Sequence, residues 1–237
     1  MPLRLVLFDL DDTLCDHARS FCLRVRRALD ALPPDVLRSP SSAVLEWALR
    51  HPNHTWEAVQ AALERAGVTE PELLERALAA YASDRYFGLE LYPDSVPAVR
   101  ALQRRLLTGI VTNGPSGIQR AKLERLGIAG LFPIVVVSEE VGVAKPDPAI
   151  FHHALACAGV PPHEALFVGD NPVNDVAGAC RAGLIGVWCN RDGRPWNGSA
   201  APALTIRSLW ELVRLVEAWA SGSASEPVPD LSVQFPA

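Results

Sequence analysis

The sequence has few cysteines, and none of them is paired in a way that points to a zinc site or a disulfide framework. Its five cysteines are odd in number and form no C-x-x-C pair, so we read them as reduced thiols of a cytosolic protein. An excess of positive charge is also missing, since 22 basic residues stand against 27 acidic ones and the net charge is −5. The chain therefore has no general electrostatic attraction for nucleic acid polymers or anionic lipid.

Long apolar runs are absent as well. No segment approaches the roughly 18 uninterrupted apolar residues of a membrane-spanning helix, and the apolar run at the start of the chain meets Asp9 too early for a signal peptide. Glycine and proline, 16 and 20 of the 237 residues, stay below the low-complexity range. We expect a folded cytoplasmic protein without a membrane partner.

Short apolar runs rich in Val, Ile and Leu are what the sequence does contain. They occupy residues 3–8, 107–111, 134–137, 165–168 and 185–187. Runs of this length are typical of strands buried on both faces of a parallel sheet. Residues 116–126 and 148–158 between them have helical spacing, and each segment stops before a glycine. This alternation predicts an α/β fold with a doubly wound, Rossmann-like parallel sheet of five strands.

The connection between the first two strands is too long for this pattern. It spans residues 17–91, and structureless loops of that length are uncommon in a compact domain. Apolar residues recur at helical spacing around 21–32, 56–66 and 73–81. Thr55 and Thr69 stand where they would cap the second and third of these helices. We therefore predict that this stretch folds as an all-helical inserted domain.

The predicted domain organisation follows from that insertion. Residues 1–16 and 92–220 form the core, and residues 17–91 form the helical insertion. A last amphipathic helix is predicted over 209–219. Residues 221–237, rich in Ser and Pro, are expected to form a flexible tail.

Polar residues follow four of the five predicted strands. The groups are Asp9 and Asp11 in D-x-D-x-T, then Thr112-Asn113-Gly114, then Lys145-Pro146, and finally Gly169-Asp170 with Asp175. In an open parallel sheet the ligand site lies beyond the carboxyl ends of the strands. We therefore expect these distant groups to meet in one crevice.

The chemistry of these groups points to a phosphoryl group. Asp9 and Asp11 are two apart, so their side chains point to one side if the strand continues through them, and their repulsion favours a cation or a proton between them. Taken singly, each group has a plainer interpretation: an acidic turn, a capped turn, or a solvated Lys145. Together, carboxylates, a lysine, a hydroxyl and backbone amides suit a phosphoryl group and a hard divalent cation. An all-oxygen ligand set favours magnesium.

The order D-x-D-x-T, strand-Thr, Lys-Pro and G-D-x-x-x-x-D resembles the haloacid dehalogenase-like hydrolases. The match is to the phosphatase branch, in which a helical cap is inserted after the first motif, and it extends over residues 1–220. The amino-acid sequence of residues 112–114 and 138–146 is similar to that of the subgroup containing pyrimidine 5'-nucleotidases and N-acylneuraminate 9-phosphatases.

The resemblance implies a role for each catalytic residue. Asp9 would be the nucleophile that becomes an aspartyl-phosphate, and Asp11 would protonate the leaving alcohol and later activate water. Thr112 and Lys145 would hold the transferring phosphoryl group, and Asn113 would contribute to phosphate binding.

The resemblance also implies a metal site. Asp9, Asp170 and the backbone carbonyl of Asp11 would bind Mg2+. Asp175 would support the metal ligands without touching the ion, or would contact it through a water molecule. Thr13 would orient the loop around Asp11.

The expected function is hydrolysis of a small phosphate monoester, a nucleoside monophosphate or a sugar phosphate, with the cap closing over the substrate. Asp11 argues against carbon–halogen cleavage, because that branch of the family has no aspartate there. Residues 17–91 contain no lysine, which argues against phosphonate cleavage through a Schiff base. A phosphomutase and a non-catalytic phosphate-binding module remain alternatives. The protein would be a monomer or a homodimer.

Overall fold

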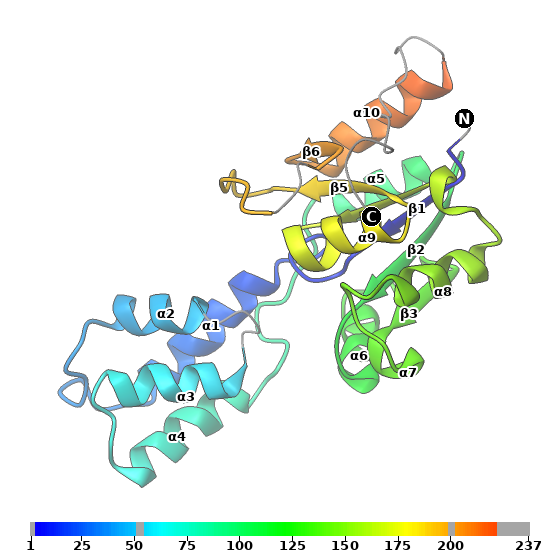
Figure 1. Ribbon diagram of the computed structural model, residues 1–237. Helices are drawn as coiled ribbons and strands as arrows, with labels where there is room; N and C mark the ends of the chain where they lie inside the picture. Colours follow the sequence, from blue (N-terminus) through cyan, green and yellow to red (C-terminus); the bar gives the residue numbers. More distant parts are fainter. Residues whose placement is uncertain (1–2, 51–54, 199–201, 222–237) are drawn as a thin grey trace. The chain divides into compact units, whose positions relative to one another are not determined.

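The computed structural model describes residues 3–50, 55–198 and 202–221 of the chain. They divide into two compact units: one made of Met1–Cys15 and Leu91–Ala237, and one made of Asp16–Glu90 (Figure 1). Each unit has its own hydrophobic core. All but the first residue of the predicted tail, 221–237, lies outside the described residues.

The first unit is built on a parallel sheet of six strands. They are β1 (Leu5–Phe8), β2 (Leu107–Thr112), β3 (Ile134–Val137), β4 (Ala165–Gly169), β5 (Ile185–Cys189) and β6 (Leu204–Ile206). The strand order is β3-β2-β1-β4-β5-β6, which is the doubly wound order of Rossmann-like sheets. The predicted fold class is confirmed, with one correction: the sheet has six strands rather than five. The additional strand, β6, has three residues, too few for an apolar run to reveal it.

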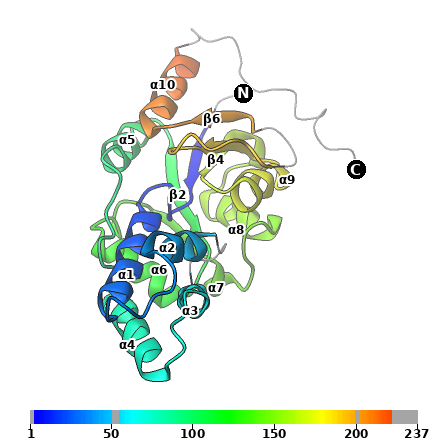
Figure 2. The same ribbon diagram turned by 90° about the vertical axis from the view of Figure 1, so that its left-hand side faces the viewer.

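Helices cover both faces of this sheet. They are α5 (Ser95–Leu102), α6 (Ser116–Arg125), α7 (Ser138–Val141), α8 (Pro148–Ala158), α9 (Gly178–Arg181) and α10 (Leu209–Ala220). Figure 2 shows α5 and α10 on one side of the sheet and α8 and α9 on the other. Covering helices on both faces explain why the strands are apolar without alternation.

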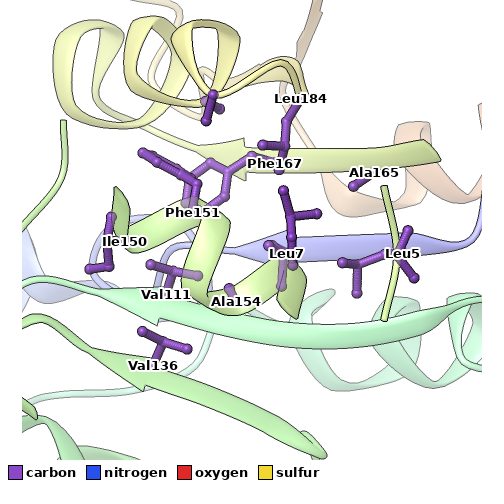
Figure 3. Packing of buried hydrophobic residues seen from close by; sticks show 14 of the residues in the cluster. Leu5, Leu7, Val111, Val136, Ile150, Phe151, Ala154, Ala165, Phe167 and Leu184 are labelled. Atoms are coloured by element: carbon purple, nitrogen blue, oxygen red, sulfur yellow. The ribbon is translucent and has the colours of Figure 1, made fainter. Parts of the chain in front are cut away.

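The packing under α8 determines where the end of β1 points. Leu5 and Leu7 of β1 lie in one cluster with residues of α8 (Figure 3). The rings of Phe151 and Phe167 meet edge to face with their centroids 4.9 Å apart in the same cluster. Because side chains alternate along a strand, the next residue of this series after Leu7 is Asp9. The buried face of β1 thus leads directly into the first acidic residue.

The second unit consists, in its described residues, of four helices. They are α1 (His17–Asp30), α2 (Ser41–Leu49), α3 (Trp56–Arg65) and α4 (Pro71–Ala82). Three correspond to the predicted segments, whereas α2 was not predicted. Thr55 precedes α3 without a side-chain cap bond. The prediction for Thr69 is wrong, since Glu70 occupies the N-terminal cap position of α4, without a side-chain cap bond, and Pro71 is the first residue of the helix.

Two further expectations can be compared with the described residues. All five cysteines lie among them, and none of the five is in a disulfide. Within the same residues, no helix combines the length and the apolar character that a membrane crossing requires.

Candidate active site

Three neighbouring strands deliver three of the polar motifs to one edge of the sheet. Phe8, the last residue of β1, lies opposite Ile110 of β2 and Val168 of β4 in the parallel register. The ladder continues one step further, because the Asp9 amide donates to the Val168 carbonyl at 2.9 Å. The motifs that begin at the strand ends therefore start side by side, as the sequence predicted.

Lys145 lies at the centre of the site. Its Nζ donates to Asp9 Oδ1 at 2.5 Å and to Asp175 Oδ1 at 2.7 Å, and only 3% of its side chain is exposed. Burial by itself lowers the pKa of this ammonium, but the Asp175 and Asp9 carboxylates outweigh burial and raise the pKa above its usual value. Lys145 is therefore a fixed positive charge.

Asn113 holds the backbone of Lys145 in place. Its Nδ2 donates to the Lys145 carbonyl at 2.8 Å, and the Lys145 amide donates back to Asn113 Oδ1 at 2.8 Å. This pair of bonds ties the end of β2 to the loop before α8. The side chain thus positions Lys145, a role that the sequence prediction, which assigned Asn113 to the phosphate, did not include.

A one-turn π-helix, η2 (Pro172–Ala177), returns Asp175 to the strand end. The amides of Asp175 and Val176 both donate to the Asn171 carbonyl, and the Asn171 amide donates to Asp175 Oδ2 at 2.9 Å. Gly169 is necessary for this return, because a Cβ at that position would lie 2.3 Å from Asp175 Oδ2. The wide turn and the glycine together place the carboxylate beside Lys145.

Asp9, Asp170 and Asp175 form a cluster that suits a hard cation. One oxygen of each lies within 4.8 Å of the others. Burial, and then the neighbouring carboxylates, raise the pKa of Asp9 well above its usual value despite the presence of Lys145. Burial and Asp175 raise the pKa of Asp170 to about 6, although Arg194, at 3.0 Å, opposes the shift. Three carboxylates face two cationic side chains, so these oxygen donors fit a divalent ion.

Asp175 has both oxygens engaged before any ion is considered. Oδ1 accepts from Lys145 and Oδ2 accepts from the Asn171 amide. These bonds favour the supporting role that the sequence predicted for Asp175 over direct metal binding. The other two carboxylates of the cluster, those of Asp9 and Asp170, are the ones placed to bind a cation directly.

Asp11 does not share the surroundings of Asp9. The strand ends at Phe8 and the chain turns through Asp12, whose φ is +57°, so the condition for both carboxylates to point to one side is not met. The Asp11 carboxylate instead accepts from Lys122 Nζ at 2.7 and 2.6 Å and from Gln119 Nε2 at 3.3 Å. Each of the two acids thus has its own lysine.

Thr112, in the motif at the end of β2, is bonded to α6, the helix that also carries the partners of Asp11. Gln119 Nε2 also donates to Thr112 Oγ1 at 2.5 Å, and both side chains are buried. Sequence analysis missed Gln119 and Lys122, because polar residues of a helix between two strands are usually solvent-exposed. Their spacing of three, on one face of α6 with buried Leu123, is the signal that was available.

Thr13 is held through its backbone. Its carbonyl accepts from Arg191 Nε at 3.1 Å and Nη2 at 2.9 Å, while its buried hydroxyl has no hydrogen-bond partner among the described residues. Arg191 also pairs with Asp94 at 3.0 Å and stacks on Tyr92 at 3.9 Å from the ring centroid. This arginine, absent from the sequence prediction, anchors the loop that carries Asp11.

The comparison with known families decides the affiliation. A family model described as haloacid dehalogenase-like hydrolase matches residues 3–183. The chain belongs to this family. The resemblance found in the four motifs is therefore confirmed, and the matched residues include every predicted site residue.

Individual relatives narrow the branch of the haloacid dehalogenase-like hydrolases. Glyceraldehyde 3-phosphate phosphatase of Methanopyrus kandleri is 36% identical over 231 residues, which cover 90% of this chain and 97% of the relative. Pyrimidine 5'-nucleotidase of Escherichia coli is 42% identical over 125 residues, 52% of this chain and 56% of the relative. A solved phosphatase of the family from Thermococcus onnurineus has a TM-score of 0.63 and 29% identity, and covers 90% of this chain and 98% of its own. The predicted phosphatase branch is confirmed.

Proposed function

We propose that this haloacid dehalogenase-like hydrolase is a magnesium-dependent phosphatase that cleaves small phosphate monoesters through a phosphorylated Asp9. The observation that supports the proposal most strongly is the position of Lys145. Its ammonium bonds to Asp9, 136 residues away, and to Asp175, 30 residues away. A buried lysine between two acids supplies the fixed charge that a phosphoryl group needs as it is transferred.

The first step transfers the phosphoryl group to the protein. An oxygen of Asp9 attacks phosphorus, and the bond between phosphorus and the leaving oxygen breaks. Asp11 gives its proton to the leaving alcohol. Lys145 opposes part of the rise that burial causes in the pKa of Asp9 and so favours the carboxylate that attacks. Thr112 offers its hydroxyl to a phosphoryl oxygen.

The second step releases the phosphate. Asp11, now a carboxylate, takes a proton from a water molecule, and that water attacks the phosphorus of the aspartyl-phosphate. The bond between phosphorus and Asp9 breaks, inorganic phosphate leaves, and both acids return to their starting forms. The same residue thus serves first as acid and then as base.

Asp9, Asp170 and the backbone carbonyl of Asp11 would hold the magnesium ion, with Asp175 supporting them. When bound, the ion neutralises the negative charge of the phosphoryl oxygens and orients the group. The closeness of the three carboxylates, and the raised pKa of Asp9 to which its acidic neighbours contribute, support this assignment.

The substrate class comes from the relatives. A triose phosphate and a 5'-nucleotide are both phosphate esters of a primary alcohol carbon, and we assign this chemistry to the substrate. We also assign selection of the leaving group to the helical unit Asp16–Glu90, as the cap domain. This division leaves phosphoryl transfer to the core and allows relatives with similar cores to differ in substrate.

The test is phosphate release from a panel of monoesters, including glyceraldehyde 3-phosphate and pyrimidine 5'-nucleotides, with and without magnesium. Asp9→Asn should abolish turnover, while Asp30→Asn, the same chemical change at an exposed position, should not alter it. With 4-nitrophenyl phosphate, Asp11→Asn should accumulate protein heavier by one phosphoryl group, because the base for the second step is missing. Wild-type turnover by Asp9→Asn would reject the mechanism, and isomerised ester in place of free phosphate would indicate a phosphomutase.

A further inference from the structure

Lys122 is an unusual residue for a helix between two strands of a sheet. It lies on α6, yet only 7% of its side chain is exposed. A buried ammonium is costly unless it is paired and hydrogen-bonded. Lysine is almost never buried to this degree without a partner, so the position calls for a specific one.

That partner is Asp11, 111 residues earlier in the chain. Lys122 Nζ lies 2.7 Å from Asp11 Oδ1 and 2.6 Å from Asp11 Oδ2. A single ammonium at nearly equal distances from both oxygens engages the whole carboxylate. This contact with both oxygens holds the carboxylate close to α6.

Two more donors define the orientation of the same carboxylate. Gln119 Nε2 lies 3.3 Å from Oδ2, and Cys15 Sγ lies 3.7 Å from Oδ1. Gln119 also bonds to Thr112 Oγ1. One face of α6 therefore holds both the side chain of Asp11 and the hydroxyl at the end of β2.

We propose that Lys122 is a positioning residue that holds Asp11 in the orientation needed for proton transfer, with Gln119 linking this orientation to Thr112. The inference rests on the proposed function, in which Asp11 is the general acid and base. Lys122 touches neither substrate nor phosphorus in this scheme and acts through Asp11. Misplacing a catalytic group by about 1 Å can lower a rate by about 10²-fold.

The test compares two esters in Lys122→Met. An alkyl phosphate has a poor leaving group that needs a proton from Asp11, whereas 4-nitrophenolate leaves without one. We expect kcat/KM for the best alkyl substrate to fall by about 10²-fold. For 4-nitrophenyl phosphate the loss should stay under about 10-fold, because proton transfer contributes little there. Equal losses with both esters would overturn the inference, since they would indicate damage to phosphate binding or to the fold.

A double-mutant cycle gives a second readout. If Lys122 acts only through Asp11, Lys122→Met should change the alkyl-ester kcat/KM by less than about 2-fold in the Asp11→Asn background. Independent, multiplicative effects in the cycle would contradict the proposal. If Lys122→Met does not fold, Lys122→Gln, which keeps a donor, is compared with the two esters in the same way.

Arg120→Met is the matched control. Arg120 lies on the same helix but is 45% exposed and pairs with Glu140. Its loss should leave both kcat/KM values within about 2-fold of wild type, as expected for an exposed pair. Asp9→Asn separates the two proposals. An active Asp9→Asn rejects the proposed function, whereas an inactive one together with uniform losses in Lys122→Met rejects only the role of Lys122.

Discussion

Gly169→Ala tests how closely the chain must pack to assemble the site. The added Cβ would lie 2.3 Å from Asp175 Oδ2 and 2.4 Å from both Asp175 Cβ and Cγ. These distances are far below van der Waals contact, so Asp175 has to move. Asp175 is buried, with only 1% of the residue exposed.

The loss of stability expected for Gly169→Ala has two sources. Overpacking of a buried position costs about 1–3 kcal/mol. Moving Asp175 also breaks its bonds with Lys145 and the Asn171 amide, and a hydrogen bond to a charged group contributes about 1.5–3 kcal/mol. We expect the free energy of unfolding to fall by about 4 kcal/mol, which for a chain of this size lowers Tm by about 10 °C. Displacement of Lys145 should lower kcat/KM by about 10²-fold.

The assays are thermal unfolding and phosphate release, with Gly117→Ala as the control. Gly117 is the second residue of α6, and a Cβ there would meet nothing within 4 Å. The control should leave stability unchanged or slightly higher, because the unfolded chain has less freedom with alanine than with glycine and the added Cβ meets no neighbour. A Gly169→Ala protein with wild-type Tm and activity would refute the close packing of Asp175 against the strand.

Three other predictions concern the loop of Asp11 and the charged cluster. Arg191→Met should lower the free energy of unfolding by about 1.5–3 kcal/mol in urea unfolding, because the Thr13 carbonyl and Asp94 lose a charged partner. Thr13→Val should leave stability equal or higher by about 1 kcal/mol, since the Thr13 hydroxyl has no partner among the described residues; a clear loss in the same assay would show that it has one. Without metal, stability should fall as pH rises from about 4 to 6, because the folded protein binds the proton of Asp170, whose pKa is about 6, more tightly than the unfolded chain does. The free energy of unfolding should fall by up to about 3 kcal/mol over this range. Tm measured against pH in the presence of a chelator should show this fall, and a Tm that rises from pH 4 to 6 would contradict the predicted direction.

The parts that sequence analysis predicted are those with local signals. Strands buried on both faces produce short apolar runs, and the described helices of residues 17–91 mostly produce a helical period. The strand β6 and helix α2 were missed because a three-residue strand has no period and because α2, SSAVLEWAL, has only a weak apolar face. Proximity of the motifs followed from topology, since parallel strands place their carboxyl ends at one edge.

The side-chain contacts within the site did not follow from the topology. Asn113 was predicted to contribute to phosphate binding, whereas the bonds of its side chain to the backbone of Lys145 were not predicted. Asp9 and Asp11 were predicted to point to one side only if the strand continued through them, and the strand ends at Phe8. Both outcomes depend on where a loop turns, which the spacing of two residues does not determine.

The sequence by itself determined the fold class and the phosphatase branch of the family, because apolar periodicity and acidic motifs are properties of neighbouring residues. Only the tertiary structure decided which cation serves which acid: Lys145 for Asp9, Lys122 for Asp11 and Arg194 for Asp170. The reason is physical. A buried charge is stable only beside a partner, and here each partner lies between 24 and 136 residues away in the chain, a distance over which no local pattern extends.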